Sequence, residues 1–244
     1  MIYIIVPAYN EEQNIARLLS SIDEVLSSEK YAYRIIIVND GSRDGTQGAA
    51  KELSYRYPIH LINHSSNKGI GAVFTTGLSA ACSMAREDED IIILIEADCT
   101  NEPPVLSKMI SKIKEGYDIV IGSRYRAGGG YIGFPPFRYI LSIGANTMLR
   151  FLFPVKGVRD YTIFFRAYKA GLIKKAFLLY GEEFITSATF VANAEVLLKL
   201  GKLSQRISEV PMIYNYSLKK GKSGMKIIST IKEYFIFIAR RVLK

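Results

Sequence analysis

Short apolar runs alternate with helical patterns along the first half of the chain, and this alternation limits the possible folds most strongly. Apolar residues at helical spacing predict helices in the intervals between the runs. Strands that are buried on both faces and alternate with helices form a mostly parallel sheet covered on both sides. The sequence therefore predicts an α/β fold. The expected strands are residues 3–7, 34–40, 59–64, 90–98 and 118–124, and the expected helices are residues 14–26, 44–57, 70–86 and 105–116.

The second half of the chain is less regular but also alternates. No internal repeat or low-complexity linker interrupts it, so we predict one domain over residues 1–225 and an amphipathic helix over residues 226–244. We expect a helix entered by prolines at 134–153, a strand at 161–168, a long helix at 182–200, a strand at 206–216 and a basic loop at 219–226.

Composition restricts the class of protein and its partners. The chain has 244 residues, of which 49% are apolar, enough for one sizeable core. The net charge of +9 suits an anionic partner, such as a nucleotide-linked substrate, a nucleic acid or an acidic membrane face, although it also serves solubility alone. Cys82 and Cys99 fit no metal or redox spacing. With no signal peptide and no long apolar span, we expect a cytoplasmic protein.

Carboxylates follow two of the expected strands. Ligands of parallel sheets bind at the carboxyl ends of the strands, where Asp40 ends the second run and Glu96 and Asp98 end the fourth. In an extended chain Glu96 and Asp98 point the same way, about 6–7 Å apart, and repel each other unless a positive charge lies nearby. Hard oxygen ligands suit Mg²⁺ or Mn²⁺, which usually bridge substrate phosphates. The alternative is a pair of strand-end acids that face solvent.

Other common sites do not fit the sequence. A dinucleotide-binding loop fails because Phe74 stands where its third glycine belongs, and a Walker loop fails because Tyr216 stands where its first glycine belongs. There is no nucleophile elbow for a serine hydrolase. His60 and His64 have no third ligand nearby for zinc.

Eight stretches, taken in order, resemble family 2 glycosyltransferases. The resemblance covers residues 2 to 226, and the nearest subgroup is similar to the dolichol-phosphate mannose synthases and polyprenyl-phosphate glycosyltransferases. It implies a GT-A fold and transfer of a sugar from a nucleotide diphosphate donor. The stretches are VPAYNEEQNI, VNDGSRDGT, NKGIGAVFTTG, EAD, GSRY with GG, RYILSIGAN, DYTIFFRAY and SEVPMIY.

The resemblance also implies roles for individual residues. Asp98, Arg124, Arg138 and Asp160 are the implied catalytic residues, and Glu96 and Asp98 the metal ligands. Arg138 and Ser142 match positions that face acceptor phosphate, and Arg166 belongs with Asp160 to a D-x-T-x-x-F-R stretch. The implied nucleotide-sugar site comprises Pro7, Tyr9, Glu11, Asp40, Lys68, Glu96, Ala97, Asp98 and Arg124.

Several positions depart from the family pattern. Glu96 stands where aspartate is usual, Thr100 where mannose synthases often have a metal-binding glutamine, and Asn39 in place of the first acid of an acidic pair. The late arginine of the family has no match, since Ser217 and Leu218 occupy its region. The nearby cations are Lys219, Lys220 and Lys222, and a lysine lacks the planar two-point geometry of arginine.

The implied reaction is a one-step inverting transfer in which metal and basic side chains stabilise the departing diphosphate. A hydroxyl acceptor would need a general base, for which Asp160 is the leading candidate, although a turn-capping role suits this residue equally. A lipid monophosphate needs no base because it is already largely anionic. Polyprenyl phosphate is therefore the first acceptor hypothesis, with GDP-mannose as donor. A saccharide hydroxyl with a UDP-glucose-type donor is the second.

The C-terminal helix adds a hypothesis about location. Its basic and apolar residues, Lys226, Lys232, Arg240, Arg241 and Lys244 among Ile, Phe and Tyr, suit a peripheral position on the anionic cytoplasmic face of a membrane. The alternatives are packing on its own domain or on a second copy in a homo-oligomer. A non-enzymatic reading, a basic module for nucleic acid, lacks any groove-reading motif, so we expect no nucleic-acid partner.

Overall fold

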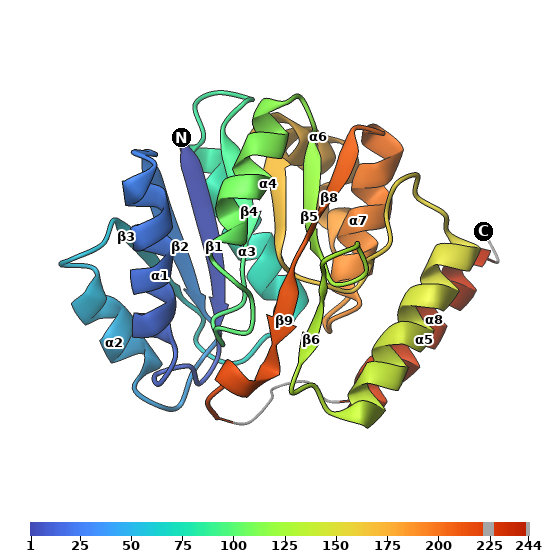
Figure 1. The fold of residues 1–244 in the computed structure, drawn as a ribbon, viewed down its shortest axis with the longest axis horizontal. Coiled ribbons are helices and arrows are strands. Elements are labelled where there is room, and N and C mark those ends of the chain that lie inside the picture. The colour runs from blue at the N-terminus through green and yellow to red at the C-terminus, as the bar shows by residue number, and fades with distance from the viewer. Residues whose placement is uncertain (222–226, 243–244) are drawn as a thin grey trace.

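A central sheet of seven strands forms the middle layer of the protein (Figure 1). The computed structural model describes residues 1–221 and 227–242, with side chains in the last segment described from 228 to 239. The strand order is β3-β2-β1-β4-β7-β5-β8, and every pairing is parallel except those of β7. The mostly parallel α/β sheet is therefore confirmed. The strands are β1 (Ile2–Ala8), β2 (Tyr33–Asn39), β3 (Ile59–Asn63), β4 (Ile91–Leu94), β5 (Ile119–Ser123), β7 (Arg166–Lys169) and β8 (Ile207–Pro211).

Helices cover both faces of this sheet (Figure 1). Helix α1 contacts α2 and α4 on one face, while α3 contacts α6, and α6 contacts α7, on the other. Each helix buries an apolar stripe, as the spacing of leucine and isoleucine in α1 requires. The six helices are α1 (Ile15–Ser28), α2 (Thr46–Leu53), α3 (Ile70–Met84), α4 (Val105–Lys114), α6 (Ala170–Tyr180) and α7 (Ala192–Leu203).

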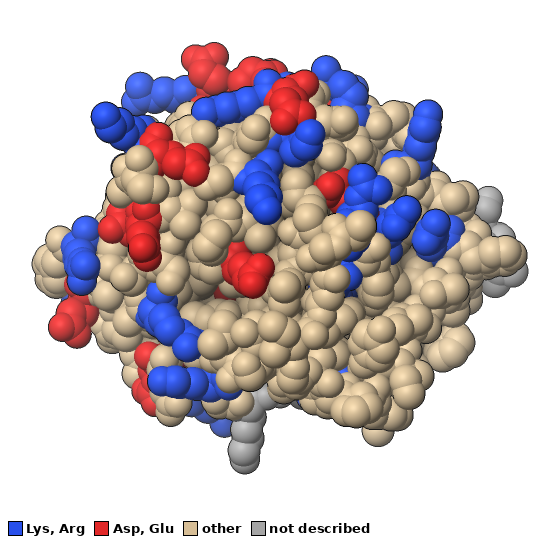
Figure 2. All heavy atoms as spheres, viewed as in Figure 1, with Lys and Arg blue, Asp and Glu red and all other residues tan. Residues whose placement is uncertain are grey.

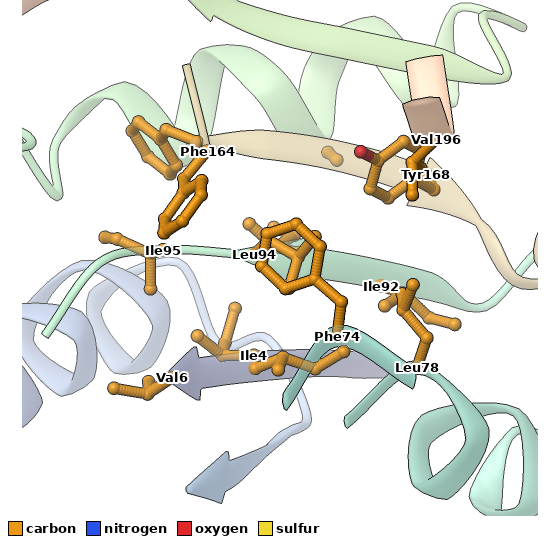
Figure 3. Packing of buried hydrophobic residues seen from close by; sticks show 14 of the residues in the cluster. Ile4, Val6, Phe74, Leu78, Ile92, Leu94, Ile95, Phe164, Tyr168 and Val196 are labelled. Carbon is orange, nitrogen blue, oxygen red and sulfur yellow. The ribbon is translucent and has the colours of Figure 1, made fainter. Parts of the chain in front are cut away.

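The core lies on both faces of the sheet, and one part of it lies between α3 and the central strands. Figure 3 shows Phe74 and Leu78 of α3 in one cluster with the buried side chains of β1, β4 and β7. A glycine in α3 permits this close packing, because a Cβ on Gly77 would lie 2.5 Å from Cγ2 of Ile5. The branched residues of β1, β4 and β5 are almost fully buried, as expected for strands covered on both sides.

Two further helices and a small sheet extend from one end of the domain. Helix α5 (Pro136–Leu152) lies beside the C-terminal helix α8 (Ile227–Val242), and the rings of Phe153 and Phe237 are 6.4 Å apart (Figure 1). Strands β6 (Gly130–Ile132) and β9 (Ile213–Asn215) pair in parallel. No helix in the described ranges is long and apolar enough to cross a membrane.

Some expectations for the second half of the chain were wrong in detail. A strand was expected at 161–168, but the strand β7 begins only at Arg166. The residues before it form a turn, because Asp160 Oδ1 accepts hydrogen bonds from the backbone N–H groups of Thr162 and Ile163. The long helix expected at 182–200 is instead a 3₁₀ turn (Gly181–Phe184) and α7.

Helix α6 was not expected, and it ends where Gly181 adopts a φ of +52°. The strand expected at 206–216 is divided between β8 and β9, which belong to different sheets. The basic loop expected at 219–226 lies outside the described residues after Gly221.

Candidate active site

A cleft of about 820 Å³ opens where β1, β4 and β5 end, and helices α5 and α8 line its far side. Parallel strands bring their carboxyl ends to one edge, which explains why segments distant in sequence meet there. The residues expected at the site that line this cleft are Pro7, Tyr9, Glu11, Asp40, Glu96, Ala97, Asp98, Arg124, Arg138 and Ser142.

The two carboxylates after β4 are held by the residues that follow them. Asp98 Oδ1 accepts hydrogen bonds from the backbone N–H of Thr100 at 3.1 Å and from its hydroxyl at 2.6 Å. Glu96 Oε2 accepts one from Asn101 Nδ2 at 2.8 Å. Cys99, between Asp98 and Thr100, has a φ of +62°, an uncommon conformation for a residue other than glycine. This tight turn keeps both carboxylates on the cleft.

The charge balance of the cleft favours binding of a cation. Burial, reinforced by the charge of Asp98, raises the pKa of Glu96 to about 8. Burial also raises the pKa of Glu11 to about 7, again with a contribution from Asp98. Three carboxylates close together in a partly dry site resist ionisation unless positive charge is added. Their oxygen donors are the type that Mg²⁺ and Mn²⁺ prefer, so the residues fit such an ion.

One lysine reaches this acidic cluster from the far end of the chain. The Nζ atom of Lys219 lies 2.5 Å from Asp98 Oδ2, and the two side chains are 10% and 8% exposed. Burial by itself would lower the pKa of Lys219, but the charges of Asp98, Glu11 and Glu96 raise it. The ammonium group therefore stays charged and neutralises one of the carboxylates.

Arg124 is fixed on the other side of the cleft by a buried ion pair. Its Nε and Nη2 atoms donate to the two oxygens of Asp160 at 2.8 and 2.7 Å, and its backbone N–H donates to Oδ2. Burial alone would raise the pKa of Asp160, but the guanidinium of Arg124 holds it below its usual value. Three tyrosine rings also lie around Arg124, with centroids 5.2–5.8 Å from Cζ. The guanidinium is thus fixed in one orientation.

Polar groups of α5 and β6 lie near the two arginines. Arg138 Nη1 donates to the hydroxyl of Tyr216 at 3.2 Å. The Ser142 hydroxyl lies 3.2 Å from that of Tyr131 and 3.3 Å from that of Tyr125. Arg138 and Ser142 therefore line the same cleft as Arg124.

Asp40 and Lys68 are joined by a hydrogen bond beside the cleft. Asp40 accepts backbone hydrogen bonds from Lys68 at 2.9 Å and Gly69 at 3.0 Å, and its Oδ1 lies 2.7 Å from His64 Nδ1. Both carboxylate oxygens therefore have protein partners, and Asp40 shapes the loop before α3. The side chain of Lys68 is exposed, and its described contact with the site is made by its backbone.

Arg166, also singled out by the sequence, lies away from the cleft. It is fully buried and donates to the carbonyl oxygens of Asn193 at 2.6 Å and Tyr161 at 2.7 Å. Its role in this structure is to connect β7 to neighbouring segments.

A second, polar cavity of about 540 Å³ adjoins the first beside the ends of β2 and β3. Tyr9 and Asn67 line both cavities, which are therefore neighbours along the sheet edge. Asn39, which replaces an acid in the family pattern, lines this second cavity and donates to Asn63 Oδ1 at 2.9 Å.

Several side chains that position the site were not expected from the sequence. Asn101 comes three residues after Asp98, and this proximity was the available signal for its contact with Glu96. The contact of Tyr214 with Arg124 and the choice of Lys219 among three lysines had no local signal, because the partners are far apart in sequence.

Comparisons with known proteins agree with this geometry. Residues 3–177 match the family model described as glycosyl transferase family 2. The chain is 33% identical to a dolichol-phosphate mannosyltransferase of Pyrococcus furiosus over 97% of its own length and 62% of that protein. It is also 33% identical to a polyprenol monophosphomannose synthase of Mycolicibacterium smegmatis, over 70% of its length and 63% of that protein. The chain thus spans less than two thirds of the length of either relative.

Solved structures resemble the fold at low sequence identity. Glucosyl-3-phosphoglycerate synthase from Mycobacterium tuberculosis, in a complex with Mn²⁺ and UDP-glucose, superimposes with a TM-score of 0.66 at 16% identity, covering 100% of this chain and 79% of that one. S. aureus TarS with UDP-GlcNAc gives 0.61 at 17% identity, covering 100% and 66%. These similarities confirm the GT-A fold that the motifs implied. Motifs, fold and family model agree, and the chain belongs to glycosyl transferase family 2.

Proposed function

We propose that this protein transfers a hexose from a nucleotide diphosphate sugar to a polyprenyl phosphate, with GDP-mannose as the first donor to test. The observation that carries the proposal is that Glu96 and Asp98 line the same cleft as Arg124 and Arg138. Acids on one side suit a metal and its diphosphate, and arginines on the other suit a second phosphate. The names of the two relatives, a dolichol-phosphate mannosyltransferase and a polyprenol monophosphomannose synthase, support this assignment.

The donor nucleotide would occupy the path along the ends of β1 and β2. Pro7, Tyr9 and Glu11 line the main cleft, and Tyr9 also lines the polar cavity in which the base would lie. Asp40 would shape this region by holding the backbone of Lys68 and Gly69. Structural neighbours that contain UDP or UDP-sugars support a nucleoside diphosphate here.

Glu96 and Asp98 would hold the divalent ion, with Thr100 and Asn101 orienting them. Bound Mg²⁺ or Mn²⁺ would neutralise the diphosphate and so improve it as a leaving group. Neighbouring structures that contain Mn²⁺ with UDP support the use of a divalent metal. The chain's own contribution is to fix both carboxylates at the cleft before the donor arrives.

Asp160 would position Arg124 and would not serve as a general base. It is 0% exposed and accepts five hydrogen bonds, three of them from Arg124. A carboxylate held this way has no free access to an acceptor hydroxyl. A phosphate acceptor needs no base, because it is already anionic. Attack by its oxygen on the anomeric carbon, opposite the leaving diphosphate, would invert the configuration there. Arg124, Arg138 and Ser142 would hold that phosphate.

The far side of the cleft suits a lipid. Residues of α5 and α8 that line it include Leu141, Met148, Ile231 and Phe235. Five apolar side chains of these two helices are 63–85% exposed: Phe137, Phe151 and Ile228, and also Ile140 and Phe235, which border the cleft. Figure 2 shows few charged side chains over α5.

We infer that this surface rests on a membrane from which the acceptor is taken, at its cytoplasmic face. Moving one Phe or Ile side chain from water into the membrane contributes about 1.5–3 kcal/mol to the free energy of binding. A few such side chains therefore suffice for reversible attachment. Of the basic side chains expected to contact anionic lipid, only Lys232, which is exposed, is described. Lys226, Arg240, Arg241 and Lys244 lie outside the side chains described.

A donor panel tests the proposal. Purified protein with Mn²⁺ or Mg²⁺ is incubated with GDP-mannose, UDP-glucose and related donors, with polyprenyl phosphate or a free saccharide as acceptor. We expect glycosyl polyprenyl phosphate in the presence of metal, and none with Asp98→Asn. The control variant Asp88→Asn, at an exposed ion pair, should retain activity. Transfer to the saccharide alone would overturn the acceptor assignment, and no transfer from any donor would overturn the activity.

A further inference from the structure

The segment that carries Lys219 is fixed on both sides of the acidic cluster. The backbone N–H of Asn215 donates to the carbonyl of Thr100 at 2.9 Å, which ties the segment to the turn after β4. Arg17 Nη2 donates to the carbonyl of Leu218 at 2.6 Å. Asn14 accepts from the N–H of Lys220 at 3.3 Å and donates to its carbonyl at 2.9 Å. The backbone on each side of Lys219 is therefore attached to α1.

Within this fixed backbone, Lys219 occupies the oxygen of Asp98 that a metal would need. Thr100 already supplies two donors to Asp98 Oδ1, so Oδ2 is the oxygen that Thr100 leaves free for a metal, and Lys219 Nζ lies 2.5 Å from it. An ammonium and a divalent ion on this same oxygen would repel each other at close range. The ammonium and a divalent ion are therefore alternative occupants of this position.

The charges of the cluster make such an exchange reasonable. Glu11, Glu96 and Asp98 face one ammonium, so a divalent ion that displaced it would still meet sufficient negative charge. The lysine side chain is long and flexible, and its ammonium can be redirected while the backbone stays attached. A diphosphate brought by the metal would give the displaced ammonium a new anionic partner.

We propose that Lys219 holds Asp98 while the metal is absent and contacts the diphosphate of the donor once the metal has bound. This inference rests on the proposed function. Of the three lysines near the position of the family's missing late arginine, Lys219 is then the one that supplies the positive charge. Lys220 is attached through its backbone and has an exposed side chain, and Lys222 lies outside the described residues.

The first test is the affinity for Mn²⁺ without nucleotide, measured by the paramagnetic resonance signal of free Mn²⁺ for wild type, Lys219→Met and Lys220→Met. Removing the competing ammonium should tighten Mn²⁺ binding about tenfold, since a neighbouring charge at this range is worth at least one pKa unit. Lys220→Met is the matched control and should bind as wild type does. Unchanged or weaker binding to Lys219→Met would overturn the inference.

The second test is the affinity for GDP and for UDP at saturating Mn²⁺, measured by calorimetry. For whichever nucleotide wild type binds more tightly, Lys219→Met should have about tenfold lower affinity, while Lys219→Arg should retain part of the wild-type affinity. The exchange predicts that Lys219→Met binds Mn²⁺ more tightly and nucleotide more weakly. If Lys219 were merely structural, its loss would weaken the binding of both. Unchanged nucleotide affinity would overturn the phosphate contact.

The same measurements distinguish a failure of the proposed function from a failure of the role of Lys219. If wild type binds neither Mn²⁺ nor a nucleoside diphosphate, the proposed function fails. If wild type binds both and Lys219→Met behaves like wild type, only the role of Lys219 fails. Thermal unfolding in the presence of EDTA verifies that each variant is folded.

Discussion

Arg124 and Asp160 form a two-point ion pair in which both side chains are almost completely buried, with exposures of 6% and 0%. The pair crosses from the end of β5 to the turn before β7, and it aims the guanidinium at the cleft. Removing one member leaves the other charged and without its main partner in a dry environment. This relationship leads to two predictions.

Replacing Asp160 with Asn should destabilise the protein strongly. We expect the free energy of unfolding to fall by about 3–5 kcal/mol, the usual cost of breaking a buried pair. Urea unfolding measures this change, and Asp88→Asn, whose side chain is 78% exposed, is the control and should change it by less than about 1 kcal/mol. A fully stable Asp160→Asn variant that has lost all activity would instead support a general base.

The same pair should affect stability in acid. The pKa of Asp160 lies below its ordinary value of 3.8 in the folded protein, so its contribution is fully present above that value. It is lost as the pH falls through the folded pKa. In urea unfolding between about pH 2.5 and 4, the wild-type free energy should therefore rise more steeply with pH than that of Asp160→Asn. Curves of equal slope would contradict the assignment.

Thr100 should affect metal binding although it is not expected to touch the ion. Its hydroxyl orients Asp98, and loss of such a supporting hydrogen bond typically costs 10- to 100-fold in metal affinity. We expect a loss in this range for Thr100→Val, measured by Mn²⁺ titration. Thr147→Val, at an exposed position of α5, is the control. Equal affinity in both variants would show that Asp98 needs no such support.

The apolar surface over α5 and α8 should control membrane attachment. Phe151→Glu and Ile228→Glu each replace a side chain that is at least 84% exposed, and each should weaken sedimentation with phosphatidylglycerol vesicles about tenfold or more. Tyr55→Glu is the matched control, because Tyr55 is 87% exposed in the turn after α2, a helix that does not border the cleft. Equal effects from all three variants would indicate that charge alone governs attachment.

Local sequence patterns predicted the first half of the fold well, for a physical reason. Runs such as Ile91–Leu94 are branched and apolar on both faces, which suits a strand inside a covered sheet. The same patterns failed for residues 161–168, where aromatic residues suggested a strand but the hydrogen bonds of Asp160 impose a turn. Tertiary contacts overrode local preference there.

The candidate site was predictable where its residues end strands, and less so where it depends on long-range contacts. Glu96 and Asp98 follow β4 directly, so their place at the sheet edge followed from topology. The contact between Lys219 and Asp98 spans 121 residues, and no local pattern distinguishes Lys219 from Lys220. Motif resemblance named Asp160, but only the geometry shows it paired with Arg124.

We propose that Glu96 and Asp98 hold a divalent ion that binds the donor diphosphate. Calorimetric titration of GDP and UDP into wild type and Asp98→Asn, with and without Mn²⁺, tests this metal site. We predict that Mn²⁺ strengthens binding of at least one nucleotide to wild type by tenfold or more, and that Asp98→Asn loses this gain. Equal strengthening by Mn²⁺ in both proteins, or none in wild type, would contradict the claim.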